Sequence, residues 1–316
     1  MTIAKSPERV RNDDFNFVVL SDRTGLARPG VFERAVAITN LMRPAFAIQV
    51  GDQIEGYTSE PAVLEQMWKE FDGIVSELEV PYYRVPGNHD VGNLVMRDEW
   101  LRRHGALHYH FRYEDVLFLV LDTQDPPQQL SEMLRPVGPG LDLPPHVAEL
   151  LDRADETPEQ ELIAELMGLL DSDPASFQTL LSAIKNGTQP ARLSEEQVSA
   201  AEAVIAEHDD VRWTFVFMHM PAWQGDGHPG LDRIRRAFRG RPYTAFAGHC
   251  HNYQHSLIDG HDHIRLATTG GARIMDTPYG DFDHITWVSM TATGPRIANI
   301  TLDGVIGVEG GPSRAL

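Results

Sequence analysis

Cysteine, basic residues and long apolar runs are all scarce in this sequence. Cys250 is the single cysteine among 316 residues, which excludes an intrachain disulfide and fits a reducing compartment. No stretch approaches the ~20 apolar residues that a membrane-spanning helix requires. Residues 1–14 also lack the apolar core of a signal peptide. The sequence therefore predicts a cytoplasmic protein with no membrane partner.

The shortage of basic residues makes the chain strongly acidic. Its 27 Lys and Arg against 46 Asp and Glu give a formal net charge of −19. Such a field repels a phosphate backbone, so we expect no nucleic-acid partner. A small phosphorylated substrate is compatible with this charge, because bound metal ions can supply positive charge locally.

The first third of the chain alternates short apolar runs with helical patterns. Strands are predicted at 15–20, 45–50 and 82–86, and amphipathic helices at 31–42 and 60–78. Each strand leads into polar residues, which are Asp22, Gly51-Asp52 and Gly87-Asn88-His89-Asp90. Strands that alternate with helices and end on polar residues are typical of a site in an α/β fold.

The same alternation continues after residue 97. The predicted elements are a helix at 97–104, a hairpin at 109–113 and 116–121, a helix at 194–208, a strand at 213–218, a helix at 231–238, and strands at 243–247, 263–269, 284–290 and 296–302. The predicted fold class is α/β, with one domain formed by 1–122 and 193–316.

Residues 123–192 interrupt this rhythm. They contain twelve Asp and Glu against four Lys and Arg, with helical patterns at 147–154, 160–170 and 177–184. We predict a helical insertion within the same domain. It is either a solvated excursion or a lid over the site, and its apolar stripes offer surface for an oligomer.

Metal-competent side chains occur at five predicted strand ends. They are Asp22, Asp52, Asn88 with His89, His219, and His249 with His251. Successive strand termini converge in an α/β sheet, so we expect these residues to lie together. Carboxylate, imidazole and amide ligands without a thiolate suit Mn, Fe or Zn, and Mg is a further option. One carboxylate can bridge two ions ~3.5–4 Å apart, and such a pair promotes hydrolysis of phosphorus esters.

In this order, the motifs GD, GNHD, H and GHxH resemble those of the calcineurin-like metallophosphoesterases, over residues 15 to 302. The resemblance implies two packed mixed β-sheets flanked by helices. It also implies two divalent metal ions with these ligands: Asp52 bridging both, Asp22 and His251 on the first, and Asn88, His219 and His249 on the second.

The resemblance further implies how the reaction proceeds. A metal-held hydroxide would attack phosphorus in line, without a covalent intermediate. His89 would face the substrate and stabilise charge or protonate the leaving oxygen, and Asp90 would fix the orientation of His89. The chain is thus predicted to be a hydrolase of phosphate mono- or diesters.

One position departs from the family motif D-x-H, because Thr24 occupies the place of the histidine. A hydroxyl is a poor substitute for imidazole, so Thr24 would bind weakly or hold a water. We therefore expect the first ion to be weakly bound or absent. Next to Thr24, Arg23 and Arg28 are either solvated or able to clamp a substrate phosphate by bidentate hydrogen bonds.

Two alternatives to a small-molecule phosphoesterase remain at this stage. A cyclic-nucleotide phosphodiesterase or a nuclease would use the same ligands, although a nuclease would need a basic groove that the sequence does not show. A degenerate, non-catalytic metal-binding module is the other alternative, and Thr24 is its support. The presence of His89 argues against it, because a binding module needs no proton donor there.

Overall fold

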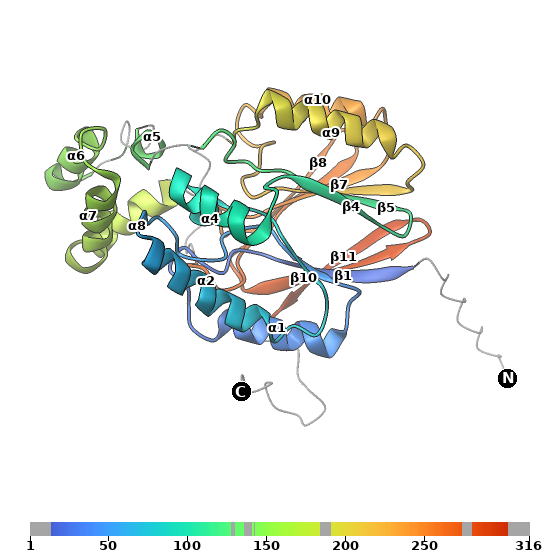
Figure 1. The fold of residues 1–316 in the computed structure, drawn as a ribbon, viewed down its shortest axis with the longest axis horizontal. Helices are drawn as coiled ribbons and strands as arrows, with labels where there is room; N and C mark the ends of the chain where they lie inside the picture. Colours follow the sequence, from blue (N-terminus) through green and yellow to red (C-terminus); the bar gives the residue numbers. More distant parts are fainter. Residues whose placement is uncertain are drawn as a thin grey trace.

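Two β-sheets face each other in the computed structural model, and helices cover the outer face of each (Figure 1). The structure describes residues 14–127, 130–135, 141, 143–183, 191–273 and 280–302. The first sheet has the strand order β11-β10-β1-β2-β3, and the second has the order β4-β5-β6-β7-β9-β8. The predicted fold class, two packed mixed sheets flanked by helices, is confirmed.

Each sheet combines a run of parallel strands with antiparallel strands, which lie at one edge of the first sheet and at both edges of the second. The first sheet consists of β1 (Phe15–Leu20), β2 (Ala47–Gln49), β3 (Tyr82–Arg84), β10 (His284–Thr291) and β11 (Gly294–Thr301). The second consists of β4 (Tyr109–Tyr113), β5 (Val116–Val120), β6 (Trp213–Phe217), β7 (Tyr243–Ala247), β8 (Gln254–Ile258) and β9 (His261–Arg265). In the first sheet β1, β2 and β3 are parallel, and in the second β5, β6, β7 and β9 are parallel. Parallel strands place their carboxyl ends at one edge of each sheet.

Side-chain alternation along each strand divides the core into layers. In β1, Phe17 and Val19 point between the sheets, whereas Val18 and Leu20 point towards the helices. The space between the sheets is rich in aromatic rings, and the ring of Phe17 lies 5.3 Å from that of Phe118 and 4.9 Å from that of Phe215. Truncating one such ring to Ala would cost about 3–5 kcal/mol of stability. This layer fixes the spacing of the two sheets.

The outer layers are amphipathic helices. On the first sheet, α1 (Val31–Met42) and α2 (Pro61–Val75) bury side chains such as Phe32 and Trp68. On the second sheet, α9 (Glu195–Glu207) and α10 (Pro229–Ala237) do the same with Ile205 and Ile234. The short α3 (Asn88–Val91) and α4 (Leu94–His104) follow β3.

Four helices from the described part of the 123–192 segment lie together at one end of the sandwich. These are α5 (Leu130–Leu134), α6 (Pro145–Asp152), α7 (Glu159–Ser172) and α8 (Pro174–Ala183). They share an apolar cluster of their own, against which Leu26 and Tyr57 from the first sheet's loops also pack. Figure 1 shows this group on the side where β1 ends.

Several predicted boundaries and elements differ from the structure. The strand β8 and the helix α5 were not predicted, since β8 is a partly polar edge strand with no buried side chain and α5 is only five residues long. Asn88 and His89 begin a helix rather than forming a loop. Residue 184, at the end of the predicted 177–184 helix, lies outside the described residues, as do residues 1–13 and 303–316. No helix among the described residues is long and apolar enough to cross a membrane.

Candidate metal centre

The six predicted ligands meet where the strands of the two sheets end. Asp22, Asp52 and Asn88 follow β1, β2 and β3 of the first sheet, whereas His219 follows β6 and His249 and His251 follow β7 of the second. All six residues are buried, and none is more than 3% exposed. The centre is therefore formed at the line of contact between the sheets, and neither sheet could form it alone.

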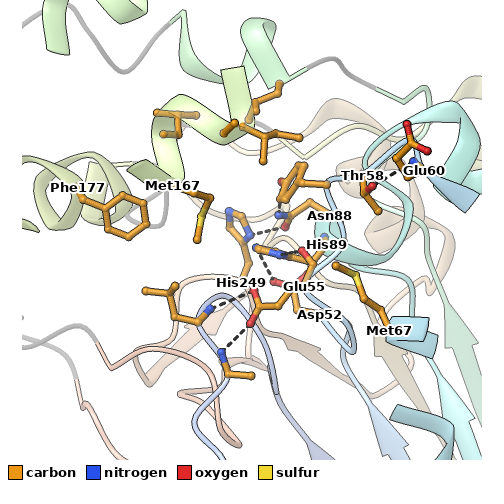
Figure 2. Close-up of a pocket in the computed structure, with 18 residues that line it drawn as sticks. Asp52, Glu55, Thr58, Glu60, Met67, Asn88, His89, Met167, Phe177 and His249 are labelled. Atoms are coloured by element: carbon orange, nitrogen blue, oxygen red, sulfur yellow. Dashed lines mark hydrogen bonds and ion pairs between the residues drawn. The ribbon is translucent and has the colours of Figure 1, made fainter. Parts of the chain in front are cut away.

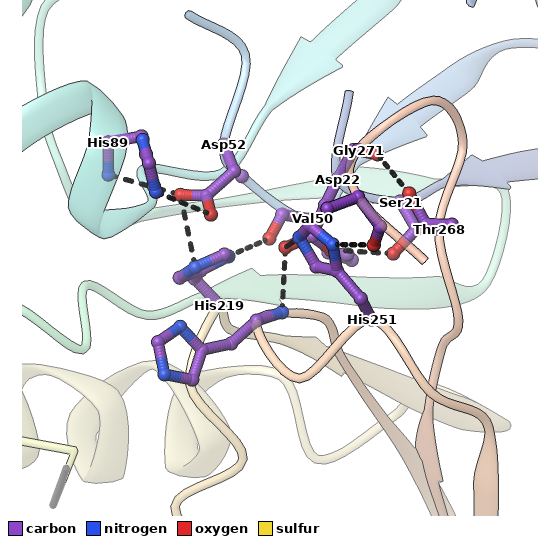
Figure 3. A network of polar contacts seen from close by, with 12 residues as sticks. Ser21, Asp22, Val50, Asp52, His89, His219, His251, Thr268 and Gly271 are labelled. Atoms are coloured by element: carbon purple, nitrogen blue, oxygen red, sulfur yellow. Dashed lines mark hydrogen bonds and ion pairs between the residues drawn. The ribbon is translucent and has the colours of Figure 1, made fainter. Parts of the chain in front are cut away.

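The ligand atoms form two groups that share one carboxylate. Asp22, Asp52 and His251 place their ligand atoms within 4.8 Å of one another, and so do Asp52, His219 and His249. Figure 3 shows Asp52 in contact with His219, and Asp22 with His251 as a neighbouring pair. Asp52 thus belongs to both groups.

Asn88 completes the second group through its side-chain oxygen. Its Oδ1 lies 2.9 Å from Nε2 of His219 and 2.9 Å from Nδ1 of His249. Its Nδ2 donates a hydrogen bond to the Tyr57 hydroxyl at 2.7 Å. Because Tyr57 takes the amide N–H, the amide oxygen must face the two imidazoles, which is the orientation that a metal ligand needs.

Backbone carbonyls fix the tautomer of two of the histidines. Nδ1 of His219 donates to the Val50 carbonyl at 2.8 Å, and Nδ1 of His251 donates to the Ala272 carbonyl at 2.5 Å. When the ring is neutral, as metal binding requires, its Nε2 atom carries the lone pair, and in both rings this atom faces a carboxylate. Such outer hydrogen bonds orient histidine ligands in metal sites.

Hydrogen bonds and closely packed glycine backbone hold the carboxylates of Asp22 and Asp52 in place. Asp22 accepts hydrogen bonds from the Ser21 hydroxyl at 2.7 Å and from the His249 amide at 2.9 Å. A Cβ atom added at Gly87 would lie 2.3 Å from Oδ1 of Asp52, and one at Gly248 would lie 2.3 Å from Oδ2 of Asp22. The glycines of the GNHD and GHxH motifs are thus required for packing against the ligands.

The buried carboxylates of the centre favour a positive charge close to them. Burial opposes the ionisation of Asp52, but the imidazoles of His219 and His89 outweigh it and hold the pKa of Asp52 well below its usual value. Burial would likewise lower the pKa of His219, yet Asp52 raises it to about 9. In the protein alone, a proton on His219 balances the buried carboxylates. Divalent ions would supply the same positive charge, so the donor set fits metal binding.

Thr24, which stands where the family motif has a histidine, is a buried residue. Burial opposes ionisation of the neighbouring Glu55 carboxylate, but the His89 imidazole and the Thr24 hydroxyl outweigh it and lower the pKa of Glu55. The Thr24 amide donates to the Asp52 carbonyl at 3.1 Å, which holds the loop against the bridging residue. The first group therefore has three strong ligands from the described residues, whereas the second has four.

His89 is oriented by a group other than the expected one. Its Nδ1 donates to the Glu55 carbonyl at 2.7 Å, and its Nε2 lies 3.9 Å from Oδ2 of Asp52. The Asp90 carboxylate instead accepts hydrogen bonds from the amides of Gln53 at 2.8 Å and Gly87 at 2.9 Å. Asp90 therefore joins the two ligand-bearing loops, and the expected contact with the His89 ring is not formed.

The two arginines beside Thr24 are bound by acceptors within the protein. Arg23 pairs with Glu70 at 2.7 Å and donates to the Gln53 carbonyl at 3.1 Å. Arg28 forms a bidentate pair with Asp283 and also donates to the Gly271 carbonyl. The geometry gives both a role in holding loops together and does not support the expected phosphate clamp.

Two functional residues were missed at the sequence level. Tyr57 orients Asn88, and the carbonyl of Glu55 orients His89. The sequence feature that could have indicated them is their position in the loop after Asp52: Glu55 is three residues beyond Asp52, and Tyr57 is five residues beyond it. The Glu55 carboxylate itself accepts hydrogen bonds from the Leu26 and Ala27 amides.

A cavity of about 780 Å³ opens beside the second ligand group. Asp52, Asn88, His89 and His249 form one wall of it, and the insertion helices form the opposite wall (Figure 2). A substrate that enters this cavity therefore reaches the centre on the side of His89.

Comparison with known proteins identifies the family. The sequence pattern described as calcineurin-like phosphoesterase matches residues 15–253. The chain belongs to this family. As a calcineurin-like phosphoesterase it is a phosphoester hydrolase, and its family implies divalent metal ions. A comparison with curated proteins gave no match.

Solved structures show the same fold at low sequence identity. A dimetal phosphatase from Danio rerio is 15% identical, with a TM-score of 0.55, and the match covers 91% of this chain and 99% of that one. The purple acid phosphatase PPD1 from yellow lupin seeds is 12% identical, with a TM-score of 0.55, over 96% of this chain and 54% of that one. GAP50 of Plasmodium is 11% identical, with a TM-score of 0.54, over 93% and 86%.

Proposed function

We propose that this calcineurin-like phosphoesterase hydrolyses a small phosphate ester with two divalent ions held at the junction of its sheets. The observation that carries the proposal is the pair of Asp and His groups that share Asp52. The first ion would be held by Asp22, Asp52 and His251, and the second by Asp52, Asn88, His219 and His249. Bound there, the ions would neutralise phosphate charge and lower the pKa of water.

The surrounding residues would position the ester and move a proton. His89 faces the cavity while its Nδ1–H is held by Glu55, so its Nε2 is the nitrogen available to the substrate. We assign Nε2 the transfer of a proton to the leaving oxygen, a role that typically contributes about 10²–10⁴-fold to the rate. The wall of insertion helices would keep bulk water from the bound ester.

The proposal is tested by metal content together with turnover. The protein would be purified without chelator, its metals counted by mass spectrometry, and aryl phosphate mono- and diesters offered with added Mn, Fe, Zn or Mg. We expect up to two ions per chain and hydrolysis with at least one of these metals. Failure of every ion to bind and to support turnover would instead favour a non-catalytic module.

His89→Asn tests the proton transfer separately. We expect kcat to fall by about 100-fold or more while the metal content stays the same. His255→Asn is the matched control, because His255 is half-exposed on β8 and pairs with Asp262 away from the centre. Unchanged turnover in His89→Asn would refute the role given to His89.

A further inference from the structure

The cavity beside the metal centre has two chemically different walls. Its inner wall carries the ligands and His89, as described above. Its outer wall consists of apolar side chains from the insertion, chiefly Leu130, Ile163, Leu166, Met167 and Phe177. Figure 2 shows Met167 and Phe177 facing the group formed by Asn88, His89 and His249 across the opening. The exposed surface of the lining is mostly apolar.

The charges of the lining exclude a second anionic group on the substrate. Apart from the centre itself, its ionisable residues are the acids Glu55 and Glu60, and no Lys or Arg is among the described residues that line it. The carboxylate of Glu55 is held by the amides of Leu26 and Ala27. A nucleotide chain or a polyphosphate would therefore bury negative charge without a counter-charge, which is costly.

The size of the cavity fits a substantial organic group. A volume of about 780 Å³ lies within the usual range for pockets that take whole small molecules. Met167 contributes an apolar side chain that is 45% exposed, so a ligand in the cavity would remove apolar surface from water on both partners. Methionine also adapts its shape to different apolar ligands.

We propose that the substrate is a phosphate ester of a large apolar alcohol, such as an alkyl or acyl-bearing alcohol. Its phosphate would lie at the metal centre, and its apolar part would lie against Ile163, Met167 and Phe177. The inference rests on the proposed function and narrows its substrate class. The insertion thereby acts as the specificity wall of the site.

A chain-length series tests the proposal. Methyl, butyl and octyl phosphates, and the corresponding 4-nitrophenyl alkyl diesters, would be hydrolysed below their critical micelle concentrations. We expect kcat/KM to rise at least tenfold from methyl to octyl, since each buried methylene favours binding. Met167→Glu should reduce the octyl-to-methyl ratio at least fivefold, and Met167→Leu should restore it. The control Leu257→Glu, at a 68% exposed residue of β8 outside the cavity, should leave the ratio unchanged.

Two outcomes separate this inference from the proposed function. Hydrolysis that does not depend on chain length would overturn the apolar substrate class while leaving the phosphoesterase intact. If no ester is hydrolysed, the inference is tested by measuring binding. Calorimetry should show that octylphosphonate binds at least tenfold more tightly than methylphosphonate. Met167→Glu should remove this difference in affinity. Equal affinities for the two phosphonates would also overturn the inference.

Discussion

Replacing Tyr57 by Phe should weaken one metal site and leave the other nearly unchanged. The substitution removes only the hydroxyl that accepts the Asn88 Nδ2 hydrogen bond at 2.7 Å. The ring, which packs 4.8 Å from that of His89, stays in place. Without this acceptor, the Asn88 amide can rotate and turn its N–H towards His219 and His249, where a metal ligand needs a lone pair.

The size of the effect follows from that single hydrogen bond. A neutral hydrogen bond contributes about 0.5–1.5 kcal/mol, and about 1.4 kcal/mol corresponds to tenfold in affinity. Mutating a residue that hydrogen-bonds to a metal ligand typically lowers metal affinity by about 10–100-fold. We therefore expect Tyr57→Phe to raise the Kd of the second ion about tenfold. The first ion would be held by Asp22, Asp52 and His251, and its affinity should therefore not depend on Asn88.

Competition with a chelator, followed by counting the ions retained, measures both sites. Tyr243→Phe is the matched control, because its hydroxyl accepts a hydrogen bond from Arg235 at 3.3 Å at the opposite end of β7 from His249. It should leave both affinities unchanged, and both variants should unfold at similar temperatures. An affinity of the second ion within twofold of wild type in Tyr57→Phe would refute the role given to Tyr57.

Two further predictions concern Thr24 and His284. Thr24→His should raise the affinity of the first ion about tenfold or more, because it adds an imidazole to a group of three strong ligands; an unchanged chelator titration would contradict this. Burial lowers the pKa of His284 from 6.5 to about 4. Between these values the unfolded chain binds a proton that the folded chain does not, so stability falls as pH decreases from 6.5 to 4, by about 3 kcal/mol. Urea unfolding of His284→Asn should show a pH dependence weaker by that amount, and parallel wild-type and variant curves would exclude it.

The meeting of the candidate ligands could be predicted from the sequence because their place depends on local pattern. The strands β1, β2 and β6 lie in short apolar runs, and Asp22, Asp52 and His219 follow shortly after these runs. Parallel strands bring their carboxyl ends together whatever the rest of the chain does. The layered fold was accessible for the same reason, although β8 was missed because this edge strand has no buried side chain and so lacks a buried apolar run.

The hydrogen bonds that orient these ligands were decided by tertiary structure. Every residue carries a backbone carbonyl, so the sequence does not indicate that those of Val50, Ala272 and Glu55 meet the three imidazoles. The same holds for Asp90, which binds neighbouring amides although it adjoins His89.

The sequence by itself determined which residue types gather at the strand ends and hence the chemistry of the centre. Only the tertiary structure decided which residues line the cavity. Met167 and Phe177 are far from Asn88 and His89 in the chain, and in the sequence they look like ordinary apolar positions of a helix. Their meeting depends on how the insertion folds back over the end of the sandwich. Local periodicity specifies that a helix is amphipathic, but it does not specify which surface its apolar side faces.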